Sequence, residues 1–381
     1  MGVNSPVRYY PPYPRFIRKA KGSRIWDVDE KEYIDFLLAY GPLILGHRPE
    51  RVINRIRETL EIGTMFGAPT EQEVQFGEIF AKAAALDKIR FVNTGTEATM
   101  HSIRLAIHHT KRKKVLKIKG GYHGTHQFNF DSDYVESVEF NSPEMIKEKL
   151  SGGEFACLIL EPVMGNLGVI NPEEGYLEEV REITENTGTL LIIDEVITGF
   201  RTGFFPYHAT KRIDPDLATY AKIIGGGLPL GAFGGKEEIM KEVRPSGAFP
   251  QAGTYSGNPV SVAAGLETLK ILSSKDYSRL KRMTDLAVRY LSESGLTVNS
   301  QTGMLSLFFT DKGVSKASEA MKSSKELYPQ FFNEALKRGV FLAPSYDETI
   351  FISFVHSESE VKETFQSLSE VAERLWKARS R

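Results

Sequence analysis

The sequence predicts an α/β protein built on a mainly parallel β-sheet, and three observations support this prediction. In the middle of the chain, short apolar runs alternate with amphipathic segments. Several runs are apolar at consecutive positions, as in strands buried on both faces of a parallel sheet. The segments between the runs have helical patterns. In such a fold the ligand site lies beyond the carboxyl ends of the strands.

The expected strands and helices alternate along the chain. The strands are Lys88 to Asn93, Lys114 to Lys119, Phe155 to Val163, Thr189 to Ile197, Leu217 to Ala221 and Gly231 to Gly234. The helices are Thr96 to Thr110, Pro143 to Leu150, Glu173 to Asn186 and Asn258 to Leu272. Asp194 and the turn after Asn93 both fall near the carboxyl ends of strands, where a ligand site is expected.

The composition is that of an ordinary globular protein. The 381 residues are 41% hydrophobic and 25% charged, which allows a large core and suggests two or three structural units. With 48 basic and 49 acidic residues the formal net charge is -1, so no overall field favours nucleic acid or an anionic membrane. The one basic cluster, Lys111 to Lys114, is expected at the C-terminus of a helix, where cations are favoured.

The single cysteine and the hydropathy pattern favour a cytoplasmic location. One cysteine excludes an intramolecular disulfide, and Cys157 lies in an apolar run, where we expect it to be buried in a reducing compartment. No apolar stretch approaches membrane-spanning length, and the first residues lack the hydrophobic core of a signal peptide. We therefore expect no membrane partner.

Asp194 and Lys222 form the most informative pair in the chain. Asp194 ends the apolar run that starts at Leu190, and Lys222 precedes the glycines Gly225 to Gly227. An enzyme that uses pyridoxal phosphate needs a lysine to bond covalently to the aldehyde and a carboxylate to hold the pyridine nitrogen protonated. Each residue alone is weak evidence, because a lysine before glycines is more often a solvated loop residue.

A phosphate site is predicted at the turn that follows the first expected strand. Thr94 and Glu97 have the spacing of a capping box, so a helix is expected to start there. Gly95 leaves room for a ligand near the backbone, and the free amides of a helix N-terminus suit a phosphate. The alternative is an ordinary capped helix.

Tyr122 and four histidines are further candidates for contacts with a ligand. Tyr122 follows an expected strand, where its ring could stack on a planar cofactor; alternatively it is a loop tyrosine beside a satisfied His123. The pairs His123/His126 and His108/His109 have no carboxylate or cysteine at a recognised ligand spacing, so no metal site is expected. The glycines from Gly225 to Gly231 do not match a dinucleotide-binding loop.

Eight segments, in order along almost the whole chain, resemble the class-III pyridoxal-phosphate aminotransferases of fold type I. They are Gly2 to Arg8, Gly41 to His47, Phe66 to Glu71, Glu161 to Asn166, Asp194 to Arg201, Lys222 to Pro229, Gly253 to Pro259 and Leu342 to Ser345. The first three resemble the aminomutase branch of the family rather than general transaminases. Such an ordered series is highly specific for the superfamily and fairly specific for the aminomutases.

The resemblance implies a two-domain organisation. Residues 51–275 would form the large pyridoxal-phosphate-binding domain, with a mainly parallel sheet of the seven-stranded type flanked by helices. Residues 1–50 and 276–381 would form a smaller α/β domain built from both termini.

The resemblance also implies a role for each site residue. Lys222 would bond to the cofactor and move protons, and Asp194 would pair with the pyridinium nitrogen. The phosphate would be bound by Gly95 and Thr96 together with Gly253 and Thr254 from the neighbouring subunit, which requires a homodimer. The remaining contacts would be Tyr122 and Val196 on the two ring faces, Asn166 on cofactor or substrate, and Ser5 and Arg8 on the substrate carboxylate.

Glu348 distinguishes the branches of the family. Many class-III transaminases place an arginine in this region to receive a second carboxylate, whereas the aminomutases have a glutamate. Here Ala343 to Glu348 supplies the glutamate, and no arginine occurs from Gly339 through Glu373. A carboxylate would repel a second substrate carboxylate by on the order of 1 to 4 kcal/mol at a few ångströms. The alternative is that Glu348 is only a surface residue.

Two features depart from the aminomutase pattern. Aminomutases usually have an additional helix before the Gly2 to Arg8 segment, whereas this sequence begins there. They also have a longer loop after Tyr-His-Gly, whereas the segment from His126 to Asn141 is short. That loop normally closes over the site, so a short one predicts a less complete lid.

The expected reaction is conversion of (S)-4-amino-5-oxopentanoate into 5-aminolevulinate, with the cofactor passing through its pyridoxamine form and no external amino donor. The first alternative is a class-III aminotransferase that acts on a β- or ω-amino acid with a 2-oxo acid acceptor. A second is a non-catalytic pyridoxal-phosphate-binding regulator, which the absence of a basic DNA-binding appendage disfavours.

Overall fold

Two structural units, each assembled from distant parts of the sequence, make up the chain. The computed structural model describes residues 2–323 and 325–379. Unit 1 contains the chain up to Pro49, the short segment Gly165–Asn171 and the chain from Asp276 onward. Unit 2 contains Glu50–Met164 and Pro172–Lys275.

A seven-stranded sheet forms the centre of unit 2. Its strands are β4 (Lys88–Val92), β5 (Lys114–Ile118), β6 (Val135–Val138), β7 (Phe155–Leu160), β8 (Leu190–Asp194), β9 (Leu217–Tyr220) and β10 (Gly231–Gly235). The order is β4-β10-β9-β8-β7-β5-β6. Strand β10 runs antiparallel to β4 and β9, and the other neighbouring pairs are parallel. The predicted α/β fold with a mainly parallel sheet is confirmed.

All six expected strands are present, although two of them end three residues earlier than expected. Strand β7 ends before Pro162, which cannot donate to a ladder. Strand β8 ends at Asp194, because the chain turns there and the backbone amide of Val196 donates a hydrogen bond to the Asp194 carboxylate. Strand β6 was not expected, because only Val135 and Val138 are buried in it.

Strand β10 is glycine-rich because neighbouring backbones approach it closely. A Cβ atom at Gly234 would lie 2.3 Å from the carbonyl oxygen of Lys88, and one at Gly235 would lie 2.1 Å from that of Asp216. Larger residues would force the neighbouring chains apart.

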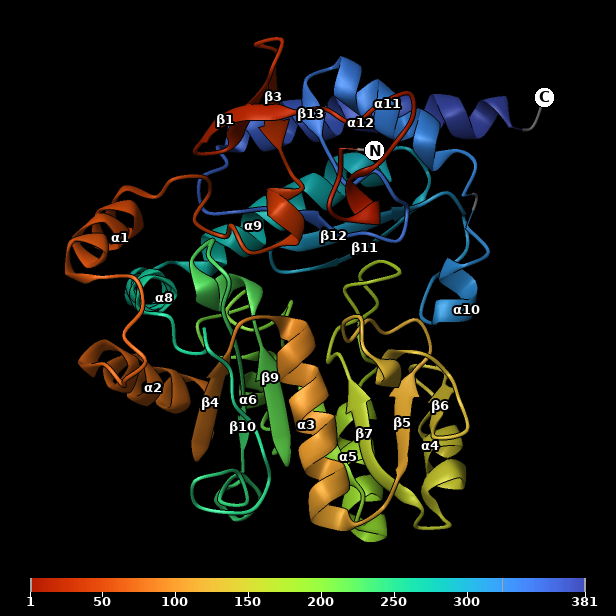
Figure 1. Cartoon of the computed structure of the whole chain (residues 1–381). Coiled ribbons are helices and arrows are strands. Elements are labelled where there is room, and N and C mark those ends of the chain that lie inside the picture. The colour runs from red at the N-terminus through yellow and green to blue at the C-terminus, as the bar shows by residue number, and fades with distance from the viewer. Residues whose placement is uncertain (1, 324, 380–381) are drawn as a thin grey trace. The chain divides into compact units, whose positions relative to one another are not determined.

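Helices cover the sheet of unit 2. They are α1 (Glu50–Ile62), α2 (Glu71–Ala84), α3 (Gly95–Thr110), α4 (Pro143–Leu150), α5 (Tyr176–Thr187), α6 (Tyr207–Lys211), α7 (Glu237–Met240) and α8 (Pro259–Leu272), with the 3-10 turns η3 (Gln127–Asn129) and η4 (Lys222–Gly225). Helix α3 lies along one face of the sheet and packs Ile103 and Leu105 into the core with Ile159 and Ile192 (Figure 1). Burial of such side chains is worth about 1.5 to 3 kcal/mol each.

The helix boundaries follow local chemistry. Helix α5 begins at Tyr176, later than expected, because Gly175 adopts the left-handed conformation at φ +80°. Helix α3 ends at Thr110 with Lys111 as its C-cap, so the basic cluster lies at a helix C-terminus as expected. Cys157 in β7 is fully buried.

Unit 1 contains two smaller sheets and four helices in its described residues. One sheet has the order β1 (Ile17–Lys21), β2 (Arg24–Asp27), β3 (Glu32–Asp35) and β13 (Val340–Phe341); the other has β11 (Thr297–Gln301), β12 (Met304–Phe308) and β14 (Ile350–Phe351). The helices are α9 (Tyr277–Ser292), α10 (Ala317–Ala320), α11 (Tyr328–Lys337) and α12 (Glu358–Ala378). Strands β3 and β13 pair in parallel, so both ends of the chain contribute to one sheet.

The segment Gly165–Asn171 belongs to unit 1 although its neighbours in sequence belong to unit 2. The amide of Val169 donates to Ser306 Oγ at 3.1 Å, and Asn171 Nδ2 donates to the carbonyl of Ser300 at 3.0 Å. Gly168 has φ +94°, and a Cβ there would lie 2.3 Å from the ring of Phe308. The division therefore differs from boundaries drawn only at residues 50 and 275.

In the described part of the chain, no helix combines the length and apolar character needed to cross a membrane.

Candidate active site

Asp194 lies at the carboxyl end of β8 and is almost completely buried. Its Oδ1 atom accepts hydrogen bonds from the amide of Val196 and from Thr219 Oγ1, both at 3.0 Å. Its Oδ2 atom lies 2.7 Å from Nδ1 of His123, which is fully buried. Because β8 and β9 pair Asp194 with Thr219, the register of the sheet sets this arrangement.

The acceptor capacity of Asp194 fits a protonated ring nitrogen. A carboxylate has about four lone-pair sites, and three described protein donors use three of them. The remaining site can accept the N–H of a pyridinium ring.

A buried hydroxyl links His123 to the N-terminal turn of α3. Thr99 Oγ1 is within hydrogen-bond distance of several carbonyl oxygens, including those of His123 and Gly95. It also lies 3.0 Å from Nε2 of His126. Burial, and then the charge of His123, lower the pKa of His126 to about 4. His126 is therefore neutral at neutral pH and contributes a hydrogen bond rather than a charge.

The N-terminus of α3 forms the expected capped turn with one difference. Thr94 Oγ1 accepts the amide of Glu97 at 3.1 Å, as predicted. The Glu97 carboxylate, however, accepts the amide of Asn93 at 2.7 Å rather than that of Thr94. The hydrogen bond from Asn93, the residue after β4, thus stabilises the turn. Gly95 and Thr96 are the first residues of the helix, so their amides have no partner within it.

Close backbone approaches bring the predicted cofactor contacts of unit 2 together. A Cβ atom at Gly95 would lie 3.2 Å from Val196 Cγ2 and 3.4 Å from the Cβ of Ala221, the residue before Lys222. Gly124 has φ +97°, and a Cβ there would lie 2.5 Å from Thr96 Oγ1. The ends of β4, β5, β8 and β9 therefore meet in one place.

Tyr122 presents its ring from a fixed backbone. Its amide donates to Oε1 of Glu161 at 3.1 Å, and that carboxylate is buried. The residue is 47% exposed in the single chain. An exposed aromatic ring held at the end of a strand can stack on a planar ligand.

Lys222 starts η4 in a rare backbone conformation. Its φ angle is +51°, and it is half-buried. A non-glycine residue in the left-handed region costs on the order of 1 to 3 kcal/mol, and such strain is concentrated at functional sites. Gly226 follows at φ +58°, where a Cβ would lie 2.6 Å from the carbonyl of Ala264 in α8. Packing against α8 therefore holds the turn that carries the lysine.

Gly253 and Thr254 are exposed on unit 2. They lie in a loop before α8 whose next residue, Tyr255, is 64% exposed. A Cβ at Gly253 would lie 3.8 Å from Asn93 Nδ2, so this loop lies near the end of β4. The exposure leaves both residues accessible to another subunit.

The predicted substrate contacts Ser5, Arg8 and Glu348 belong to unit 1. Ser5 precedes the 3-10 turn η1 (Pro6–Arg8), and Arg8 is exposed. Burial and then the Glu348 carboxylate raise the pKa of Tyr40, whereas Arg8 lowers it. Arg8 and Glu348 therefore both act on one phenol.

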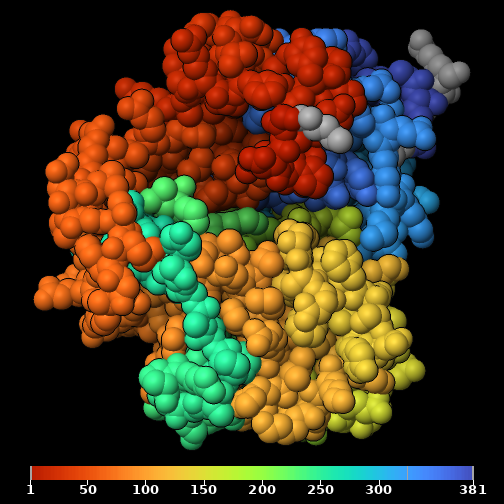
Figure 2. All heavy atoms as spheres, viewed as in Figure 1, coloured from red at the N-terminus to blue at the C-terminus, as the bar shows by residue number. Residues whose placement is uncertain are grey.

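A cleft of about 480 Å³ lies between the N-terminal segment and the loop that carries Glu348. Both sides belong to unit 1, and the lining includes Pro6, Val7, Tyr9, Ser345 and Glu348. The start of the chain lies on the surface of its unit, where Figure 2 shows it in red.

Asn166 is half-buried and lies in the segment Gly165–Asn171, which belongs to unit 1. Its neighbour Gly165 accepts a hydrogen bond from Thr349 Oγ1 at 2.6 Å, one residue after Glu348. The contact links the Asn166 segment to the Glu348 loop.

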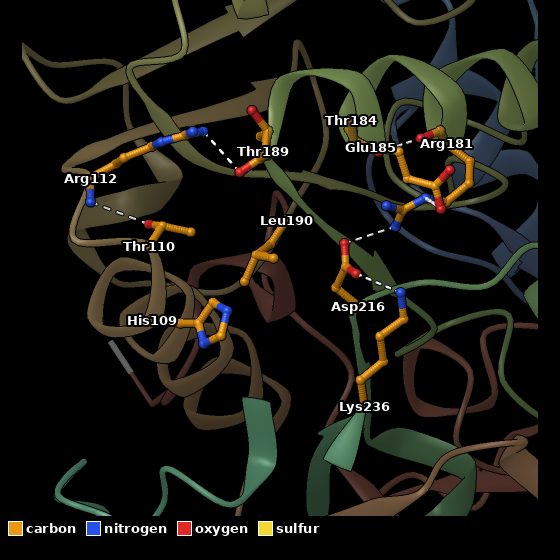
Figure 3. A pocket seen from close by; sticks show the side chains of 11 residues that line it. His109, Thr110, Arg112, Arg181, Thr184, Glu185, Thr189, Leu190, Asp216 and Lys236 are labelled. Atoms are coloured by element: carbon orange, nitrogen blue, oxygen red, sulfur yellow. Dashed lines mark hydrogen bonds and ion pairs between the residues drawn. The ribbon is translucent and has the colours of Figure 1, made fainter. Parts of the chain in front are cut away.

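Another cleft, in unit 2, is lined by charged side chains that have structural roles. It measures about 440 Å³ and lies at the amino ends of β8 and β9, whereas Asp194 lies at the carboxyl end of β8. Asp216 joins Arg181 at 2.8 Å and Lys236 at 2.9 Å, and it also accepts the amide of Leu191 (Figure 3). Burial raises the pKa of Asp216, but the hydrogen bonds from Arg181, the Leu191 amide and Lys236 together lower it below its usual value.

Arg112, on the other side of this cleft, caps a helix. Its Nη1 atom donates to the carbonyls of Thr187 and Gly188 at the end of α5, and to that of Phe155 at the start of β7. A cation is favoured at a helix C-terminus, and the unpaired carbonyls there need donors. The charged side chains of this cleft are thus used in holding α5 against the sheet.

In unit 2, sequence reasoning missed His123, Thr219 and Thr99, and in unit 1 it missed Tyr40. His123 and Thr219 become partners of Asp194 only through the fold, and no local pattern marks them. Tyr40 immediately precedes the Gly41 to His47 segment, and the family resemblance of that segment is the sequence feature that could have indicated it. Among the described residues, no group of three or more His, Cys, Asp or Glu side chains could hold a metal ion.

Comparison with known families agrees with this geometry. The family Aminotransferase class-III matches residues 6–131 and 131–372. The chain belongs to the class-III aminotransferase family.

Within that family, the chain is similar to glutamate-1-semialdehyde 2,1-aminomutases. The protein of that name from Thermoplasma volcanium is 44% identical over 394 residues, which cover 96% of this chain and 94% of the relative. The one from Persephonella marina is 42% identical over 412 residues, covering 98% and 95%. The predicted resemblance to the aminomutase branch is confirmed.

Solved structures share the fold. An omega-transaminase from Sphaerobacter thermophilus has a TM-score of 0.92 at 26% identity, covering 97% of this chain and 94% of that chain. A glutamate-1-semialdehyde aminomutase from Pseudomonas aeruginosa, solved in complex with PMP, has a TM-score of 0.86 at 23% identity, covering 96% and 88%. At that identity, the second comparison supports the fold alone.

Proposed function

We propose that the protein is a pyridoxal-phosphate-dependent aminomutase that converts (S)-4-amino-5-oxopentanoate, also called glutamate-1-semialdehyde, into 5-aminolevulinate for tetrapyrrole synthesis. The observation that carries the proposal is that Arg8 and Glu348 lie on the same side of unit 1: Tyr40 bonds to Val7 next to Arg8, Val7 and Glu348 line one cleft, and both charges act on the Tyr40 phenol. One cation can bind one substrate carboxylate, and the neighbouring carboxylate repels a second. This charge pattern favours a monocarboxylate substrate and disfavours an external dicarboxylate amino donor such as glutamate.

The residues of unit 2 fit pyridoxal phosphate. When bound, this cofactor supplies an electron-accepting ring and, in its pyridoxamine form, an amino group. Asp194 would hold the ring nitrogen protonated through a charge-assisted hydrogen bond. Tyr122 and Val196 would contact the two ring faces, and the amides of Gly95 and Thr96 at the start of α3 would bind the phosphate.

Lys222 provides the reactive amine. It would hold the cofactor covalently and would move protons at the substrate carbon that gains or loses the amino group. Ser5 and Arg8 bind the substrate carboxylate, Glu348 excludes a second one, and Asn166 offers an amide to cofactor or substrate without imposing a charge.

We further propose a homodimer in which Gly253 and Thr254 of the partner subunit complete the phosphate site. Two features support it: the exposure of both residues, and exposed apolar side chains in and beside α1 and α2. These side chains are Leu60, Ile62, Phe66, Val74 and Ile79. Apolar side chains exposed in a single chain mark candidate subunit interfaces. A cytoplasmic location is part of the same proposal, in keeping with the single, buried Cys157.

The reaction is tested with purified protein, glutamate-1-semialdehyde and no other amino compound. We expect 5-aminolevulinate to form in proportion to the substrate consumed, and added glutamate or 2-oxoglutarate to leave the rate unchanged. A strict requirement for a 2-oxo acid would instead identify a class-III aminotransferase for a β- or ω-amino acid.

The shared site is tested by mixing two inactive variants, Lys222→Ala and Gly253→Asp. If the site is shared, a hybrid dimer contains one site with both lesions and one site with neither, so activity returns. If each chain completes its own site, every site in the hybrid retains one lesion and the mixture stays inactive.

A further inference from the structure

The turn that carries Arg8 has few contacts of its own. Turn η1 (Pro6–Arg8) has no buried residue, and the side chain of Ser5 does not cap it. Its internal bonds are those from Arg8 N to Ser5 O and from Tyr9 N to Pro6 O. Short 3-10 turns are not stable in isolation, so the position of Arg8 depends on contacts from elsewhere in unit 1.

Tyr40 supplies such a contact. Its hydroxyl donates to the carbonyl oxygen of Val7 at 2.6 Å, directly before Arg8. Among the described residues Arg8 has no ion pair, and its charge acts on the phenol of Tyr40. The hydroxyl therefore holds the main chain next to a guanidinium that remains available to a ligand.

The backbone of Tyr40 is itself held in an uncommon conformation. Leu38, Ala39, Tyr40 and Gly41 all have positive φ angles, at 48°, 56°, 66° and 111°. Consecutive left-handed residues are rare because each non-glycine residue is sterically disfavoured. Such a turn persists only where surrounding contacts determine it.

Asp35, at the end of β3, provides those contacts. Its Oδ1 atom accepts the amides of Leu37 and Leu38, both at 2.9 Å. Its Oδ2 atom lies 2.7 Å from Nε2 of His47. Asp35 is buried and Leu38 is fully buried, so the turn is anchored in the core of unit 1.

We infer that Tyr40 is a positioning residue for the substrate carboxylate: the braced left-handed turn presents its hydroxyl to Val7, and this bond sets the place of Arg8. The inference rests on the proposed function for the identity of the carboxylate and deepens it by naming what fixes its receptor. Tyr40 acts through Arg8 and needs no contact with the reacting atoms.

The test is the Tyr40→Phe variant, which removes only the hydroxyl. With glutamate-1-semialdehyde we expect KM to rise roughly two- to tenfold, the range for loss of one hydrogen bond, with kcat and cofactor affinity retained. Tyr13→Phe is the matched control, because it removes an exposed hydroxyl from the same N-terminal segment. In the Arg8→Ala background, Tyr40→Phe should raise KM no further.

A second measurement does not depend on the substrate. Trypsin cleaves after arginine, and cleavage after Arg8 requires η1 to leave its place. We expect the Tyr40→Phe protein to be cut there roughly two- to tenfold faster than wild type or Tyr13→Phe, because the open form is more populated.

Unchanged KM and unchanged cleavage in Tyr40→Phe would overturn the inference while leaving the aminomutase proposal intact. Additive effects with Arg8→Ala would also overturn it, because Tyr40 would then act independently. If wild type fails to convert the substrate but Tyr40→Phe is cleaved faster, the tie between Tyr40 and Arg8 stands and the proposed reaction alone fails.

Discussion

The Nδ1 atom of His123 lies 2.7 Å from Oδ2 of Asp194, and both side chains are buried. Because the carboxylate can only accept, His123 donates through Nδ1. The histidine thereby orients the carboxylate that is proposed to face the cofactor ring.

We expect His123→Leu to reduce kcat and weaken cofactor binding. Losing a hydrogen bond to a charged group costs about 1.5 to 3 kcal/mol, or roughly ten- to hundredfold. His123→Asn, whose amide can replace the Nδ1 donor, should retain most of both. Kinetics and a fluorescence titration with pyridoxal phosphate measure the effects. Equal behaviour of the two variants would show that the hydrogen bond to Asp194 is unimportant.

Lys222→Ala should lose nearly all turnover, because no other amine is expected at that position. In wild type, borohydride reduction followed by peptide mapping should find the phosphopyridoxyl group on the peptide that contains Lys222. Lys119→Ala, at an exposed lysine paired with Glu139, is the control and should keep its activity. Label on a different lysine would disprove the assignment.

Arg8→Ala should weaken apparent substrate binding by about 1.5 to 3 kcal/mol, the range for a hydrogen bond to a charged group. The KM for glutamate-1-semialdehyde measures this loss. Arg18→Ala is a suitable control, because Arg18 is an exposed arginine of the same unit that pairs with Glu30. If both variants keep the wild-type KM, Arg8 does not bind the carboxylate.

The short segment from His126 to Asn141 should form an incomplete lid. Part of it is β6 and is therefore committed to the edge of the sheet. We expect the diamine intermediate, 4,5-diaminovalerate, to escape during turnover, and added diamine to raise the steady rate severalfold. Stoichiometric product without any response to added diamine would mean that another part of the protein retains the intermediate.

Stability should fall as the pH falls from about 6.5 to about 4. Burial lowers the pKa of His356 to about 4. Its Nδ1 accepts the amide of Ser353, and its ring stacks on Phe36 at 4.3 Å. Between the two pH values His356 binds a proton in the unfolded chain but not in the folded chain, so this histidine alone contributes a slope of up to about 1.4 kcal/mol per pH unit.

Urea unfolding at several pH values measures this slope. His356→Asn retains an acceptor for Ser353 and should flatten the slope in the same pH range, whatever its effect on stability at pH 7. A slope equal to that of wild type would show that His356 is not the group responsible.

The sequence by itself determined most of the elements of unit 2 and the candidate residues on them. Helix α4 runs from Pro143 to Leu150 as predicted, and Thr94 caps α3 as its spacing from Glu97 indicated. These features depend on neighbours within a few residues, where periodicity and capping are local properties. The sequence also marks Asp194, which ends one apolar strand, and Lys222, which follows the next, at positions that the family resemblance indicates.

The tertiary structure alone decided which residues meet. His123 reaches Asp194 across 71 positions of sequence, and Thr219 reaches it through the pairing of β8 with β9. The left-handed turn at Tyr40 depends on Asp35 and buried packing, which override the intrinsic preference of Leu38 and Ala39. Such contacts arise from sheet order, register and chain path, and these are set by the whole core rather than by any local pattern.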